Sequence, residues 1–123
     1  MNVQEQLRAL VERHLVTLAE QLATVARLLT PSGATLPVAQ VVEAEAIMHQ
    51  LKGSSGSMGF DDIGALASEL DETLKLLKKN SEAIPAAELA STLKLLSALR
   101  HMADNTTPAM SKLYNADVAK LSG

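Results

Sequence analysis

The stretch MHQLKGSSGSMGF, residues 48–60, begins as a helix-forming sequence and continues as a string of glycine and serine. If the string is a loop, His49 is an ordinary residue near the end of a helix. If the helix continues through it, one helical face has been left without side chains beside His49 and Lys52. The residues on either side of this stretch decide between these two interpretations.

The composition limits the classes of protein to consider. A chain of 123 residues has the length of one domain, which we assign to residues 1–123, and it leaves no room for a nucleotide-binding kinase domain. A formal net charge of −3 and only two aromatic residues, Phe60 and Tyr114, argue against nucleic-acid binding. The absence of cysteine excludes disulfides and thiolate chemistry.

No uncharged stretch is suited to crossing a membrane. The longest one, residues 28–42, contains two prolines and a glycine, and the charged N-terminal residues interrupt the apolar core that a signal peptide needs. We therefore expect a soluble, cytoplasmic protein that does not bind membranes.

Apolar residues spaced three and four apart predict a first helix over about residues 3–29. The segment TPSGATLP, residues 30–37, ends this helix. A second helix is expected from Pro37 to Met58, and Gly59 is expected to terminate it. Asp61 or Asp62 is expected to cap a third helix. The apolar stripe of that helix consists of Ile63, Leu66, Leu70, Leu74 and Leu77.

The second half of the chain continues the helical pattern. NSEAIP, residues 80–85, is predicted to be a loop, after which Pro85 opens a fourth helix. Thr107 and Pro108 are expected to begin a shorter fifth helix over about residues 108–121. The predicted fold class is all-α: an antiparallel four-helix bundle over about residues 3–103 with an additional short C-terminal helix.

The second helix places His49 on its water-facing side. At about 100° per residue, the apolar stripe of this helix lies opposite the imidazole. The residues predicted to share the face of His49 are Val42, Glu45, Ala46, Lys52, Gly53 and Gly56. Each glycine costs about 0.5–1 kcal/mol relative to alanine in a helix interior, so stability does not explain two of them on an exposed face. The close approach of another molecule would explain the two glycines. We therefore interpret the glycine and serine string as part of the second helix.

A solvent-facing imidazole beside an ammonium group suits phosphoryl chemistry. The neutral imidazole of His49 is a good nucleophile at physiological pH and can accept a phosphoryl group. The ammonium group of Lys52 can neutralise phosphoryl oxygens.

The segment HQLKGSSGSMG, residues 49–59, resembles the motif of histidine-containing phosphotransfer (HPt) domains. The family pattern is His-x-Leu-Lys-Gly-Ser, followed by a glycine that ends the helix. The matching residues are His49, Leu51, Lys52, Gly53, Ser54 and Gly59. The resemblance extends over the predicted bundle, about residues 3–103.

The resemblance implies a role for each matching position. His49 would be the phosphoacceptor, Lys52 would stabilise the phosphoryl group, and Gly53 would leave room for the active-site loops of a receiver domain. Asp71 and Lys75 of the third helix are candidates to reach toward the imidazole. The expected receiver-docking residues are Val42, Glu45, Ala46, Gln50, Gly53 and Gly56.

The resemblance also implies partners and cofactors. The expected partner is the receiver domain of a response regulator or of a hybrid histidine kinase, and the chain is expected to be a monomer. We predict a phosphoryl carrier without autokinase activity and without a cofactor of its own, with Mg²⁺ bound by the receiver. The alternative is a non-catalytic helical adapter that binds a receiver domain without phosphotransfer.

Other interpretations of these residues have less support. His14 and His101 have no Lys-Gly companion and are expected to be surface or boundary residues. No metal site is predicted, because Glu45 lies four residues before His49, whereas metal-binding bundles use Glu-x-x-His. The glycine and serine string also lacks the Gly-Lys-Ser/Thr ending of a phosphate-binding loop.

Overall fold

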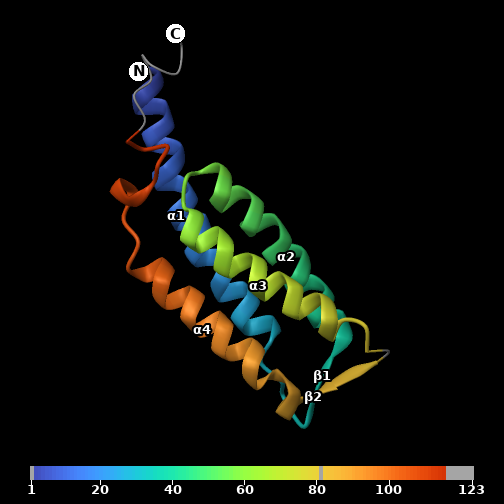
Figure 1. Cartoon of the computed structure of the whole chain (residues 1–123). Helices are drawn as coiled ribbons and strands as arrows, with labels where there is room; N and C mark the ends of the chain where they lie inside the picture. Colours follow the sequence, from blue (N-terminus) through green and yellow to red (C-terminus); the bar gives the residue numbers. More distant parts are fainter. Residues whose placement is uncertain (1, 81, 116–123) are drawn as a thin grey trace.

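Four helices form the molecule in a computed structural model that describes residues 2–80 and 82–115. The bounds are Val3–Leu28 for α1, Val38–Ser57 for α2, Asp61–Leu77 for α3 and Ala90–Asp104 for α4. Consecutive helices run antiparallel, and α4 returns to α1 (Figure 1). The predicted all-α four-helix bundle is confirmed. None of the described helices combines the length and apolar character needed to cross a membrane.

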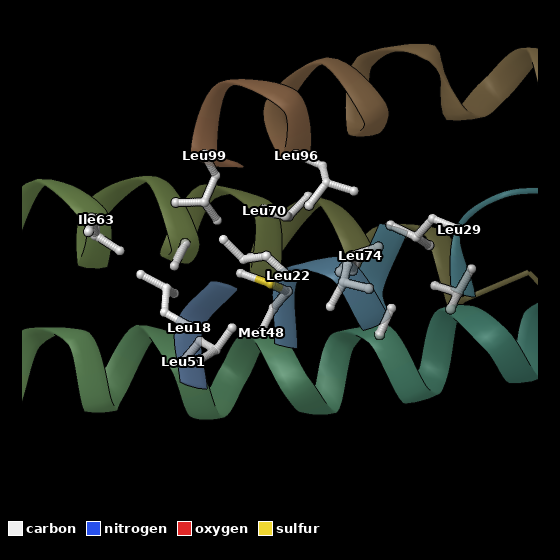
Figure 2. Close-up of a cluster of buried hydrophobic side chains, with 14 of the residues drawn as sticks. Leu18, Leu22, Leu29, Met48, Leu51, Ile63, Leu70, Leu74, Leu96 and Leu99 are labelled. Atoms are coloured by element: carbon white, nitrogen blue, oxygen red, sulfur yellow. The ribbon is translucent and has the colours of Figure 1, made fainter. Parts of the chain in front are cut away.

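The bundle core consists of side chains that all four helices direct toward the central axis (Figure 2). Leu18 of α1, Met48 of α2, Leu70 of α3 and Leu99 of α4 are each fully buried. In the stripe predicted for the third helix, Ile63, Leu70 and Leu74 are buried and Leu66 and Leu77 are half-buried. The helical phase predicted for α3 is therefore confirmed.

The helix ends differ in part from the prediction. Gly59 ends α2 with a φ of 84°, as expected for glycine beyond a helix C-terminus. The residue at the N-cap of α3 is Phe60, without a side-chain hydrogen bond, so the prediction that Asp61 or Asp62 caps this helix is wrong. Both aspartates lie in the first helical turn, where their negative charge interacts favourably with the helix dipole.

The segment predicted to end the first helix and the segment predicted to be a loop each contribute one strand to a short antiparallel pair. Strand β1 is Thr35–Pro37 and strand β2 is Ala83–Pro85, and Leu36 lies opposite Ile84, both fully buried. This pair lies at the end of the bundle where α2 and α4 begin (Figure 1). A short 3₁₀ helix, η1 (Ala86–Leu89), follows β2 and precedes α4.

The predicted fifth helix is wrong over residues 108–115. There the structure has only a 3₁₀ helix, η2 (Pro108–Met110), followed by turns, and residues 116–121 of the prediction lie outside the described residues. We call residues 108–115 the C-terminal strap. Buried Ser111 donates a hydrogen bond to the Met58 carbonyl, and the Lys112 amide donates to the Gly59 carbonyl over 3.1 Å. These contacts with the α2–α3 turn take the place of helical hydrogen bonds.

The C-terminal strap also contacts α1. The guanidinium group of Arg8 lies 4.9 Å from the ring centroid of Tyr114, and its Nε donates to the Tyr114 carbonyl over 3.3 Å. The Tyr114 hydroxyl donates to Glu12 over 3.4 Å. The strap therefore joins α1 to the turn that ends α2.

Gly59→Ala is expected to lower the free energy of unfolding by about 2 kcal/mol. The new Cβ would lie 2.7 Å from the Leu113 amide nitrogen, on a backbone whose φ of 84° disfavours a side chain. Urea unfolding measures the change. Gly33→Ala is the control, because a Cβ there meets nothing within 4 Å. Equal losses of unfolding free energy in both variants would show that neither the backbone conformation nor the C-terminal strap excludes a side chain at Gly59.

Candidate functional site

His49 lies on α2 with its side chain 61% exposed and one ring nitrogen held by α3. Its Nδ1 lies 3.3 Å from Oδ2 of Asp71, a fully buried residue of α3. Among the described residues, Nε2 of His49 has no hydrogen-bond partner. The imidazole is thus held on its inner side by Asp71 and open to solvent on its outer side, and the helical phase had predicted the exposure to solvent.

The buried carboxylate of Asp71 forms ion pairs with two lysine side chains. Its Oδ2 lies 2.8 Å from Nζ of Lys52 and 3.4 Å from Nζ of Lys75. Burial by itself would raise the pKa of Asp71, but the contacts with the Lys52 ammonium and the His49 ring and the charge of Lys52 outweigh it and lower the pKa to about 2. An ionised carboxylate only accepts hydrogen bonds, so the proton of the neutral imidazole is held on Nδ1.

The lowered pKa of Asp71 makes the stability of the protein depend on pH. A carboxyl group whose pKa falls from 3.8 to about 2 on folding contributes stability above about pH 4, and this is lost as the pH falls toward 2. We expect Asp71→Asn to flatten the dependence of the free energy of unfolding on pH in this window. Chemical denaturation at several pH values measures it, and an unchanged slope would show that Asp71 carries no such linkage.

The surface around His49 is open on one side. Val42, Ala46, Gln50, Gly53 and Gly56 are all exposed, as predicted. A Cβ added at Gly53 or at Gly56 would meet no atom within 4 Å. The two glycines therefore leave open space beside the imidazole and do not serve helix packing.

Glu45 departs from the prediction that it shares this exposed face. It is only 7% exposed, and its Oε1 accepts a hydrogen bond from Nζ of Lys78 at the C-terminus of α3. Its position lies toward the flank of α2 against which α3 packs, so α3 covers it. The prediction that Glu45 lies on the exposed face is therefore wrong, and little of its surface can contact another protein.

The other two histidines lie away from this site. His101 is exposed on α4, as predicted. His14 is buried, so its prediction as a surface or boundary residue is wrong. Its Nε2 lies 3.1 Å from the hydroxyl of buried Ser55, its ring stacks on Phe60, and burial lowers its pKa. His14 is a core residue that joins α1 to α2.

The structure also brings three side chains of metal-binding type close together. Glu45, His49 and Asp71 each offer an atom able to bind a metal, and these atoms lie within 4.8 Å of one another. The ammonium groups of Lys52, Lys75 and Lys78 already contact the two carboxylates. The lack of a metal site stays a prediction.

Comparison with known families agrees with this geometry. The family model "Hpt domain" matches residues 5–106, which include α2, α3, α4 and all but the first two residues of α1, and which end before the C-terminal strap. Hpt domains take part in phosphorelays as phosphoryl carriers, interact with receiver domains and have no kinase activity of their own. No curated protein and no solved structure matches the chain significantly. Because the family model covers most of its length, the chain belongs to the Hpt domain family.

Proposed function

We propose that this protein is a phosphorelay carrier that accepts a phosphoryl group on Nε2 of His49 and passes it to or from a receiver-domain aspartate. The observation that supports it most is the exposed imidazole whose Nδ1 is held by buried, ionised Asp71. With the proton on Nδ1, the lone pair of Nε2 faces solvent as a nucleophile.

The transfer step needs no group beyond the two domains and the Mg²⁺ of the receiver. Nε2 of His49 attacks the phosphorus of the receiver's aspartyl phosphate. An N–P bond forms as the P–O bond to the aspartate breaks, and the aspartate leaves as a carboxylate. The imidazole keeps its proton on Nδ1, where Asp71 stabilises the positive charge that develops on the ring. The reverse step returns the phosphoryl group to a receiver.

Two lysines are placed to stabilise the phosphoryl oxygens. Lys52 and Lys75 approach the same oxygen of Asp71 as His49 does, and their side chains are 25% and 36% exposed. Either ammonium group can turn from Asp71 toward a phosphoryl group on Nε2, where a charge-assisted hydrogen bond is stronger than a neutral one.

The proposed receiver-docking surface consists of Val42, Ala46, Gln50, Gly53 and Gly56. The open space beside Gly53 and Gly56 admits receiver loops that carry the aspartate and its Mg²⁺ in line with Nε2. In this function the protein works with receiver domains in the cytoplasm as a monomer.

A non-catalytic adapter would use the same surface without phosphotransfer. An adapter has no need for an exposed imidazole held at Nδ1, and this contact favours the carrier. Incubation with a phosphorylated receiver and Mg²⁺ distinguishes the two. We expect an acid-labile phosphohistidine on this chain. Receiver binding without a phosphohistidine would instead identify an adapter.

Lys52→Ala is expected to slow phosphoryl transfer, or to shorten the lifetime of the phosphohistidine, by about tenfold, because it removes a charge that stabilises the phosphoryl oxygens. Receiver affinity should change little, since a partly exposed charge contributes little to docking. Rapid-quench kinetics and titration calorimetry measure the two effects. Lys94→Ala on the exposed face of α4 is the control. If both variants transfer alike, Lys52 has no part in the reaction.

A further inference from the structure

Two lysines share one oxygen of Asp71, and their other contacts differ. Nζ of Lys52 on α2 lies 2.8 Å from Oδ2, and no other carboxylate of the described residues pairs with it. Nζ of Lys75 on α3 lies 3.4 Å from the same oxygen and also 3.4 Å from Oε1 of Glu72. Lys52 is therefore bound across two helices by one carboxylate, whereas Lys75 is bound within its own helix by two.

This difference decides which ammonium group turns when His49 is phosphorylated. A phosphoryl group on Nε2 adds negative charge on the outer side of the imidazole, and a lysine that turns toward it gives up its earlier contacts. Lys52 gives up one carboxylate, and it lies three residues after His49 on the same helix. Lys75 would give up two carboxylates and would have to turn away from α3 toward α2. Lys52 is thus the lysine that turns.

The departure of Lys52 leaves a buried carboxylate that needs another cation. Asp71 is fully buried, and removal of one partner from a buried ion pair is strongly destabilising because it leaves an uncompensated charge. Lys75 remains beside Oδ2, so the carboxylate stays compensated and keeps its contact with Nδ1 of His49. We propose that Lys75 is a positioning residue, the reserve counterion that stays on Asp71 while Lys52 turns to the phosphoryl group.

Unfolding of the unphosphorylated protein tests whether the two lysines share Asp71. This sharing does not depend on the proposed function, whereas the turning of Lys52 rests on it. Lys52→Ala and Lys75→Met each leave one cation on the carboxylate, so each should lower the midpoint of urea unfolding only slightly. The double variant leaves none. Its unfolding equilibrium constant should exceed the value expected from the two single variants by about tenfold.

The same three variants in an Asp71→Asn protein provide the control for this cycle. An amide carries no charge and needs no counterion, so the effects of Lys52→Ala and Lys75→Met should add there. Effects that add with Asp71 in place would overturn the proposal. A coupling of equal size in the Asp71→Asn protein would also overturn it, because the two lysines would then interact by another route.

In the phosphorylated protein the two lysines should act as a unit. Lys75→Met should shorten the phosphohistidine lifetime, or slow transfer, as Lys52→Ala does, because Asp71 then retains Lys52. The double variant should lose no more than about twofold beyond Lys52→Ala, since residues that act together have non-additive effects. Lys79→Met, which removes an exposed lysine four residues further on, is the control and should behave as the parent protein.

Two other kinetic outcomes would overturn the proposal. If the losses of Lys52→Ala and Lys75→Met multiply in the double variant, Lys75 contacts the phosphoryl group itself. If Lys75→Met keeps the parental lifetime and transfer rate, Lys52 needs no substitute on Asp71. Both outcomes are read in proteins whose folding the urea experiment has already measured.

Spectra of the lysine ammonium groups in the parent protein show which lysine turns. ¹H–¹⁵N correlation spectra follow the two Nζ signals, and Lys52→Ala and Lys75→Met assign them by loss of one signal each. Phosphorylation should shift the Lys52 signal and leave the Lys75 signal near its original position. A shift of Lys75 as large as that of Lys52 would overturn the proposal. If the parent protein accepts no phosphoryl group, the proposed function fails, but the unfolding cycle still decides whether Lys75 is a second counterion of Asp71.

Discussion

His49→Gln is expected to abolish phosphoryl acceptance and to leave the bundle folded. The side chain is 61% exposed and packs into no part of the core, so its replacement should change the free energy of unfolding by no more than about 0.5 kcal/mol. The glutamine amide is not a nucleophile toward phosphorus. Incubation with a phosphorylated receiver and Mg²⁺, followed by thermal unfolding, measures both effects.

His101→Gln is the matched control, because His101 is also an exposed helical histidine. This control should accept phosphoryl groups at the parental rate. Phosphate found on His14 or His101 in the His49→Gln protein, at the parental rate, would refute the assignment of His49. The burial of His14 makes it an unsuitable acceptor.

Gly53 should show opposite effects on stability and on phosphotransfer. Gly53→Ala and Gly53→Gln should each stabilise the helix by up to about 1 kcal/mol, because glycine is the less favourable residue there and a Cβ meets nothing within 4 Å. A glutamine side chain would occupy the space beside His49 that a receiver's aspartate must enter. Gly53→Gln should therefore lose about a hundredfold in transfer rate through misalignment, with Gly53→Ala intermediate.

Ala98→Gln controls for the added side chain, because Ala98 is exposed on α4, which lies away from α2. It should transfer at the parental rate. Unfolding of the Gly53→Gln protein would show that Gly53 faces the core. Normal transfer by that protein would show that the open face of α2 has no part in docking.

The helices were predictable from the sequence because their apolar periodicity is long and regular. The strand pair was not predictable, because Leu36 and Ile84 each lie in a strand of three residues, which is too short to show an alternating pattern. The C-terminal strap was mistaken for a helix because Pro108 is a typical helix-start residue. The sequence pattern does not reveal that Ser111 bonds to Met58 in the α2–α3 turn instead.

The exposed half of the site followed from the periodicity of one helix. His49 and Gly53 lie where the second-helix phase placed them. The position of Asp71 opposite His49 agrees with a short antiparallel turn, since the two residues lie equally far before and after Phe60. The burial of Glu45 and His14 depends on which neighbouring helix covers each flank, and one helix's own pattern does not contain that information.

The most direct test asks which atom of the protein carries phosphorus. Phosphoramidate, a small phosphoryl donor, avoids the need for a particular receiver, and ¹H–¹⁵N correlation spectra distinguish the two ring nitrogens of a phosphorylated imidazole. We predict a single phosphorylated residue, His49, with phosphorus on Nε2 and the proton retained on Nδ1. Phosphorus on Nδ1, or on a residue other than His49, would contradict the role assigned to the contact between His49 and Asp71.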